Sequence, residues 1–218
     1  MDRYDILQSV SQGEDREMPK ENIFLAQVIN DLRAAIERRR DNEKESCSGR
    51  EYVMWLNEQE KRVAEQWAKE RELWTDMSDI FKYGSPGPSG SESDTYLGRD
   101  GFIYKTNNLM HCGDSIVKTL TKFIMYNQVF PDSAYSFVGF AGFTGRSVYP
   151  IVKQPFIVNP YPATKIEIGY FMASLGFQNI GEGKFKNSRF ILSDILPKNI
   201  LKDEDGDFYA IDAEICLA

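Results

Sequence analysis

The chain has 218 residues, of which 42% are hydrophobic and 13% aromatic, so it can bury a core in one domain or two small ones. Its net charge of −7 argues against nucleic acid as a partner, because phosphates need a basic surface. Three scattered cysteines without a CxxC spacing argue against structural zinc and for a reducing compartment. With neither a long apolar run nor a signal-peptide pattern, we expect a cytoplasmic protein that makes no membrane contact.

Two helices are predicted at the start of the chain. Apolar residues recur at every fourth position from residue 22 to about 39. From residue 51 to about 77 they recur at intervals of four and seven residues. The polar residues 41–49 predict the turn between them. We therefore expect a helical N-terminal segment over residues 1–78.

The second helix carries an aromatic stripe that has two interpretations. It could dock a protein partner, which would make helices 22–77 an interaction module, or it could pack on the following domain. The stripe consists of Trp55, Trp67 and Trp74.

After the second predicted helix, the sequence pattern changes from helical periodicity to short strands. Residues 83–93 are rich in Gly, Pro and Ser and predict a loop. The pattern of the remaining chain predicts the order β-β-α-β-β-α-β-β, which indicates an α+β fold with an antiparallel sheet interrupted by one helix. The expected strands are 95–97, 102–105, 135–143, 147–158 and a final one at 208–211, with extended segments at 184–192 and 199–201. The expected helices are 114–127 and 164–175, the second with Thr164 as its cap.

Three oxygen-bearing side chains near the C-terminal end form the most informative motif. Asn199 lies five positions after Asp194, and Asp212 lies 18 positions after Asp194, following a predicted strand. Two carboxylates and an amide at this spacing can hold magnesium and orient a hydroxyl group for phosphoryl transfer. The alternative interpretation is a strand turn in which the Asp residues act as caps.

The chain from about residue 80 onwards resembles the kinase-like domain found in polyvalent proteins of phages and conjugative elements. The resemblance implies a minimal protein-kinase-like fold over residues 79–218 with a reduced C-terminal lobe. It also implies ATP and magnesium as cofactors, and a hydroxyl acceptor that could be a protein or a small molecule. The strings that carry it are Gly90–Ser93 ahead of Tyr96–Leu97, Tyr104–Lys105, Lys153–Phe156, Gly176–Phe177, Asp194–Asn199 and Ile211–Ile215.

The same resemblance implies a role for each candidate site residue. Asp194 matches the general base, Asn199 and Asp212 match the metal ligands, and Lys105 matches the catalytic lysine that holds the α- and β-phosphates. The other implied nucleotide-binding residues are Gly90, Ser91 and Ser93 in the phosphate loop and Gln154, Phe156 and Ile157 in the hinge, where backbone groups would bind adenine. The alternative for Lys105 is an ordinary lysine at the end of a strand. The alternative for the phosphate loop is a plain linker, and the alternative for the hinge is an edge strand at Pro155.

Several positions depart from the family pattern. Leu192 and Ser193 replace the His and Arg before the base, and Ala213 and Glu214 replace the Phe-Gly that follows the metal-binding Asp. The helix over 114–127 contains no Glu that could pair with Lys105. These departures keep open a second function, a weak or inactive pseudokinase-like module that binds nucleotide or a partner. A catalytic pair of His111 and Cys112 is a further, weaker alternative, since no third orienting group is recognisable.

Overall fold

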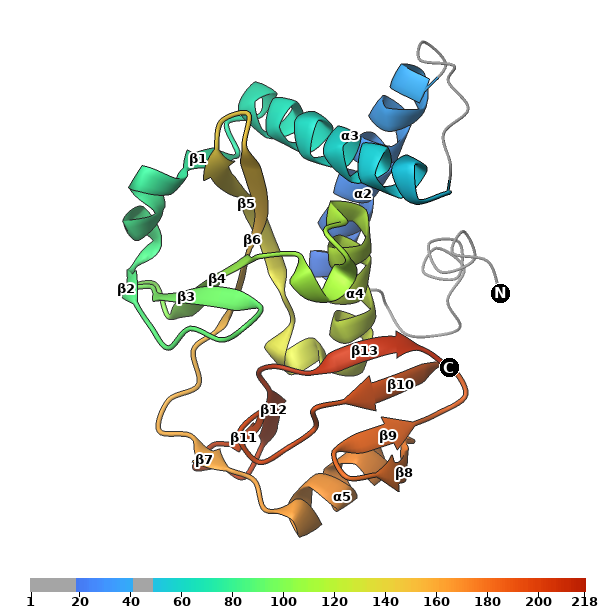
Figure 1. The fold of residues 1–218 in the computed structure, drawn as a ribbon. Coiled ribbons are helices and arrows are strands. Elements are labelled where there is room, and N and C mark those ends of the chain that lie inside the picture. The colour runs from blue at the N-terminus through green and yellow to red at the C-terminus, as the bar shows by residue number, and fades with distance from the viewer. Residues whose placement is uncertain (1–18, 41–48) are drawn as a thin grey trace. The chain divides into compact units, whose positions relative to one another are not determined.

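The computed structural model describes residues 19–40 and 49–218, and these form two compact units (Figure 1). The first unit comprises the described residues up to Thr121 together with Ser136–Lys153, and the second comprises Lys122–Tyr135 and Gln154–Ala218. Helix α4 (Ile116–Val129) contributes its first residues to one unit and the remainder to the other. No helix within the described ranges is both long enough and apolar enough to cross a membrane.

Helices α2 (Lys20–Arg40) and α3 (Gly49–Glu70) lie where the apolar periodicity places two helices. The predicted extension of the second helix to residue 77 is wrong, because the helix ends at Glu70. Glu72 adopts a left-handed conformation, with φ 59°, and the N–H groups of Glu72 and Leu73 bond the carbonyls of Lys69 and Ala68. This pattern is a Schellman motif, which satisfies the last carbonyls of the helix and turns the chain. The connection predicted over 41–49 lies almost wholly outside the described residues.

A six-stranded sheet forms the centre of the first unit, in the order β1-β5-β6-β4-β3-β2. Its β3–β4 hairpin confirms the hairpin predicted over 95–105, but β1 pairs with β5 in parallel, so the sheet is not wholly antiparallel as expected. Its strands are β1 (Trp74–Asp76), β2 (Ser85–Pro86), β3 (Ser93–Leu97), β4 (Phe102–Asn107), β5 (Ser136–Phe143) and β6 (Ser147–Pro155). Short 3-10 helices at Met77–Tyr83 and Met110–Cys112 complete this unit.

The close approach of β1 to β5 depends on a glycine. Gly139 has a φ of 157° and lies at a bulge in β5, where a Cβ atom would come within 2.3 Å of the carbonyl oxygen of Leu73. The N–H of Phe140 bonds the same carbonyl at 2.9 Å. The missing side chain therefore allows the chain that enters β1 to pack directly against β5.

Helices α2 and α3 pack on strand β5 of this sheet. The Trp67 ring contacts Phe137 and Phe140, with ring centroids 6.4 and 6.3 Å away. Trp74 belongs to β1, so two of the three residues of the predicted aromatic stripe take part in the packing of the first unit. The buried apolar side chains of α2 are Leu25, Val28, Ile29, Leu32 and Ile36.

A buried carboxylate joins α3 to the N-terminus of α4. Glu60 accepts hydrogen bonds from the Ser115 hydroxyl at 2.9 Å and from the Val117 backbone N–H at 3.1 Å, and it is 3% exposed. An acidic group at a helix N-terminus satisfies free N–H groups and interacts favourably with the helix dipole. Glu60 thus connects α3 to the start of α4 within the first unit.

The second unit combines helix α5 (Lys165–Ser174) with two small sheets. The predicted cap is confirmed, because Thr164 and Glu167 form a reciprocal capping box at the start of α5. One sheet has the order β13-β10-β9-β8 and the other β12-β11-β7. The strands are β7 (Tyr161–Pro162), β8 (Gln178–Gly181), β9 (Lys184–Lys186), β10 (Phe190–Ser193), β11 (Ile200–Lys202), β12 (Phe208–Ala210) and β13 (Glu214–Leu217).

Aromatic side chains link these parts of the second unit. Phe171 on α5 stacks on Phe208 of β12 at 5.2 Å and lies 6.3 Å from Phe130, which follows α4. A 3-10 helix at Pro131–Ser133 closes this corner. The single extended segment expected over 184–192 is in fact two strands, because Asn187 forms a turn in which its side-chain oxygen accepts the N–H groups of Arg189 and Phe190.

Candidate active site

Asp194 lies at the end of β10, where the chain turns sharply. Its φ of 58° is left-handed, a conformation that Asp and Asn tolerate better than other non-glycine residues. The side-chain nitrogen of Asn199 donates to the backbone carbonyl of Asp194 at 2.8 Å and to its carboxylate oxygen Oδ2 at 2.7 Å. The predicted base and the predicted amide ligand are therefore brought into direct contact.

Backbone pairing places Asp212 beside this turn. The N–H of Ile211 bonds the carbonyl of Asn199 at 2.9 Å, which continues the antiparallel pairing of β11 with β12. On the other side, β13 pairs with β10 so that Glu214 lies opposite Ser193. Asp194 follows Ser193, which pairs with Glu214, and Asp212 follows Ile211, which bonds Asn199. Both Asp residues thus belong to one hydrogen-bonded framework.

The side chains at this turn suit a hard divalent cation. Because Asn199 uses its side-chain nitrogen on Asp194, its oxygen Oδ1 is the atom that could coordinate a cation, and the residue is 5% exposed. Asp212 and Asp194 add carboxylate oxygens. Oxygen donors of this kind fit magnesium, whereas a soft-metal site would need thiolate or imidazole ligands.

Lys198 is a member of this cluster that the motif did not single out. Its ammonium group lies 3.1 Å from Asp194 Oδ2, four residues earlier in the chain. The side chains of Lys198 and Asp194 are 66% and 38% exposed, so the pair is open to solvent. The signal in the sequence was only a basic residue next to Asn199, which is too common to stand out.

The predicted phosphate-binding residues lie in the first unit. Lys105 is on β4, half-buried and opposite Thr95 of β3. In the loop before β3, the N–H of Gly90 bonds the carbonyl of Ser93 at 3.0 Å, and the side chain of Asn108 bonds the carbonyl of Ser91 at 2.7 Å. The loop is therefore a hydrogen-bonded turn in which the Gly90 donor is already engaged.

The predicted hinge coincides with the passage of the chain from one unit to the other, between Lys153 and Gln154. The strand expected over 147–158 ends earlier, at Pro155, whose ring cannot donate a further ladder bond. The Gln154 side chain is buried and bonds the carbonyl of Ser133 at 2.7 Å. Phe156 and Ile157 follow in irregular structure, and Phe156 is 48% exposed.

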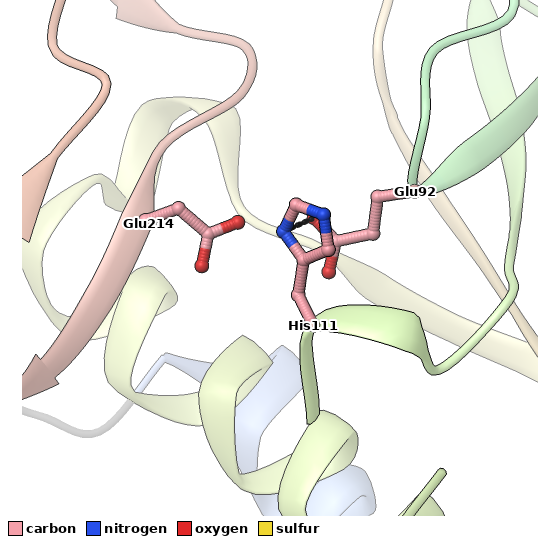
Figure 2. A group of neighbouring side chains, drawn as sticks. All are labelled: Glu92, His111 and Glu214. Carbon is pink, nitrogen blue, oxygen red and sulfur yellow. Dashed lines mark ion pairs between the residues drawn. The ribbon is translucent and has the colours of Figure 1, made fainter. Parts of the chain in front are cut away.

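His111 lies beside an acidic side chain. Its Nδ1 atom is 3.8 Å from Glu92 Oε2, and both residues belong to the first unit (Figure 2). Glu214, the third residue drawn in Figure 2, belongs to the second unit, where it pairs with Lys122 at 2.9 Å. Glu92 is thus an acidic neighbour of His111 that the sequence pattern did not single out.

Similarity to known proteins gives independent evidence about the family of this chain. A search of curated proteins gave no match. The family model of the serine/threonine/tyrosine kinases found in polyvalent proteins matches residues 57–218, which include α4, both sheets of the second unit and every predicted site residue. The match confirms the resemblance inferred from the sequence and extends it into α3. The chain therefore belongs to the family of serine/threonine/tyrosine kinases found in polyvalent proteins.

Proposed function

We propose that this protein is an ATP- and magnesium-dependent phosphotransferase that moves the γ-phosphate to a hydroxyl acceptor. The observation that carries the proposal is the contact of Asn199 with Asp194, together with the backbone bond between Ile211 and Asn199, inside the region that matches a kinase family. Phosphoryl transfer depends on positioning and charge stabilisation more than on covalent chemistry. An arrangement that fixes two carboxylates and an amide supports both requirements.

Each residue has a role in this proposal. Asp194 accepts or orients the proton of the acceptor hydroxyl, and Asn199 and Asp212 hold the magnesium ion. When bound, the metal neutralises charge on the phosphates. Lys105 holds the α- and β-phosphates. Backbone groups of Gly90, Ser91 and Ser93 contribute to the phosphate loop, and those of Gln154, Phe156 and Ile157 to the adenine site.

An alternative function is a pseudokinase-like module that binds nucleotide without efficient transfer. The observation that favours it is the pairing of Asp194 with both Lys198 and Asn199, at 3.1 and 2.7 Å, which engages one oxygen, Oδ2, of the carboxylate that the acceptor would need. The replacement of the usual residues by Ser193, Ala213 and Glu214 points the same way. In this alternative the protein binds ATP and shows no turnover.

The N-terminal helices have a proposed role as scaffold. Trp67 packs on β5 and Glu60 caps α4, so α3 supports the sheet of the first unit and the start of α4. The domain boundary predicted at residue 79 and the partner surface predicted on helices 22–77 stay predictions. A chain that starts at Asp79 tests the boundary, since it should stay folded if the helices are an independent module.

The test of the proposed function combines nucleotide binding with transfer of labelled phosphate. Titration calorimetry should show ATP binding that is tighter with magnesium, and radiolabelled ATP should label the protein itself or a hydroxyl acceptor. Asp212→Asn should lower transfer by about a hundredfold or more, because a site that stabilises developing charge loses a major group.

The matched control is Asp205→Asn, which removes a carboxylate from the turn between β11 and β12. Asp205 is exposed and lies outside the proposed ligand set, so transfer should match that of the wild-type protein. Magnesium-dependent ATP binding without any transfer would favour the pseudokinase-like alternative. The absence of magnesium-dependent ATP binding in the wild-type protein would contradict both functions.

A further inference from the structure

Two side chains of α4 contact the chain on either side of Asp212. The ammonium group of Lys122 lies 2.9 Å from Glu214 Oε1, and the Tyr126 hydroxyl donates to the carbonyl of Ala210 at 2.5 Å. Lys122 and Tyr126 are four residues apart, so they lie on one face of the helix. Ala210 and Glu214 are each two residues from Asp212, so the two contacts are placed symmetrically around it.

The two α4 side chains are sheltered from solvent. The Lys122 side chain is 11% exposed and Tyr126 is 1% exposed. Burial raises the pKa of Tyr126, and the nearby charge of Asp212 raises it further, so the hydroxyl stays protonated and keeps its donor role. A partly buried ion pair is screened much less than a surface pair. The exposed pair of Lys165 and Glu182, with side chains 74% and 76% exposed, shows the opposite situation in the same unit.

The Tyr126 contact belongs to a buried polar network. Its hydroxyl also accepts a hydrogen bond from Gln154 at 3.4 Å, and Gln154 bonds the carbonyl of Ser133. The Tyr135 hydroxyl contacts the carbonyl of Ile211 at 3.5 Å. The carbonyls of Ala210 and Ile211 and the carboxylate of Glu214 are thus each bound by a side chain from α4 or the segment that follows it.

We propose that Lys122 and Tyr126, together called the α4 anchor, are positioning residues that hold the Asp212 segment in its metal-binding place. This inference rests on the proposed function, in which Asp212 is a magnesium ligand. The anchor acts through the ion pair to Glu214 and the hydrogen bond to Ala210. In the family pattern, this helix carries a Glu that pairs with the catalytic lysine, here Lys105. Helix α4 instead carries Lys122, which pairs with Glu214.

The first test is the magnesium enhancement of nucleotide binding, the ratio of the Kd values for ATP without and with magnesium. Lys122→Met should reduce this ratio by about tenfold, as expected for a residue that orients a metal ligand. Its Kd without magnesium should stay unchanged, because that binding does not use Asp212. Lys122→Arg should keep most of the enhancement, and the charge swap of Lys122→Glu with Glu214→Lys should restore part of it.

The control is Lys165→Met, which removes the lysine of the exposed pair in the same unit and should leave the ratio unchanged. A purely structural role of Lys122 would change thermal stability without a selective loss of the magnesium effect. If Lys122→Met keeps the full wild-type enhancement, the inference is overturned.

The second test needs no nucleotide, so it separates this inference from the proposed function. Hydrogen exchange of residues 208–217 should be faster in Lys122→Met and in Tyr126→Phe than in the wild-type protein, and unchanged in Lys165→Met. If the wild-type protein shows no magnesium enhancement, the proposed function fails, and faster exchange in the variants still supports the α4 anchor. Unchanged exchange in both variants overturns it.

Discussion

The two units hold their predicted site residues in different ways. In the second unit, Asp194 and Asn199 share side-chain hydrogen bonds, and backbone pairing on both sides fixes the position of Asp212. In the first unit, the loop around Gly90 and Ser91 is a turn held at its rim by the side chain of Asn108. The proposed metal ligands therefore lie in a framework of paired backbone, whereas the predicted phosphate loop depends on a few exposed bonds.

This difference suggests a division of labour. Groups that stabilise charge in the transition state must be positioned before the reaction, and paired backbone provides that order. A loop that covers a nucleotide must allow it to enter and leave, and weak exposed bonds permit such movement. We therefore expect substitutions in the second unit to lower kcat and substitutions in the loop to change KM.

The largest effect is expected for Asn199→Ala. The substitution removes both hydrogen bonds to Asp194 and a proposed metal ligand, so kcat should fall by about a hundredfold. Steady-state transfer of labelled phosphate measures the change, with circular dichroism as a check on folding. The control Asn187→Ala removes an asparagine that also holds a turn with two side-chain hydrogen bonds, at the opposite end of β10, and should keep the wild-type kcat. An equal loss in both variants would show that the effect comes from the fold alone.

A smaller effect, on stability, is expected for the scaffold of the first unit. Glu60→Ala leaves the Ser115 hydroxyl and the Val117 N–H without their acceptor, so the free energy of unfolding should fall by about 1–3 kcal/mol. Denaturation in urea measures this loss. If the variant matches the wild-type protein, α3 does not support α4 in the way that the contacts indicate.

The same residue gives a pH dependence. Burial raises the pKa of Glu60 above its ordinary value of 4.5. The folded protein then holds the proton more tightly than the unfolded chain, so the stability from this group is complete below pH 4.5 and is lost as the pH rises through the folded pKa. Relative to Glu60→Gln, the wild-type protein should therefore lose stability as the pH rises above 4.5.

A helix cap of the second unit should behave in the opposite way. The bond to Lys202, and then the bonds from Thr164, lower the pKa of Glu167 to about 2. Stability from Glu167 is therefore present above its ordinary value of 4.5 and is lost as the pH falls towards 2. Urea denaturation of Glu167→Gln and Glu60→Gln at several pH values compares the two slopes. Slopes of the same sign would contradict the assignment.

The smallest effect is expected for Asn108→Ala in the first unit. It removes two exposed hydrogen bonds, one to the Ser91 carbonyl and one from the Met110 N–H, and leaves the β3–β4 pairing intact, so the KM for ATP should rise by roughly threefold to tenfold with kcat unchanged. Initial-rate measurements over a range of ATP concentrations separate the two constants. If Asn108→Ala lowered kcat as much as is expected for Asn199→Ala, the expected division between effects on KM in the first unit and on kcat in the second would be wrong.

The sequence determined the features that depend on neighbouring residues. The spacing of Asp194, Asn199 and Asp212 identified the candidate site, and the capping box at Thr164 and the hairpin of β3 and β4 were predictable from a few adjacent positions. The apolar periodicity located α2 and α3, because a helix repeats every 3.6 residues whatever it packs against. The end of the second helix was misplaced, since the Schellman motif uses Glu72 in a conformation that its residue type does not suggest.

The tertiary structure alone decided which distant residues meet. The ion pair of Lys122 with Glu214, the cap that Glu60 provides for α4 and the parallel pairing of β1 with β5 each join segments that are far apart in the chain. No local pattern encodes such contacts, because a lysine in a helix or a glutamate on a helix face looks the same whether it meets solvent or a partner. The packing of the helices and sheets selects the partner, and with it the residues that hold the candidate site in place.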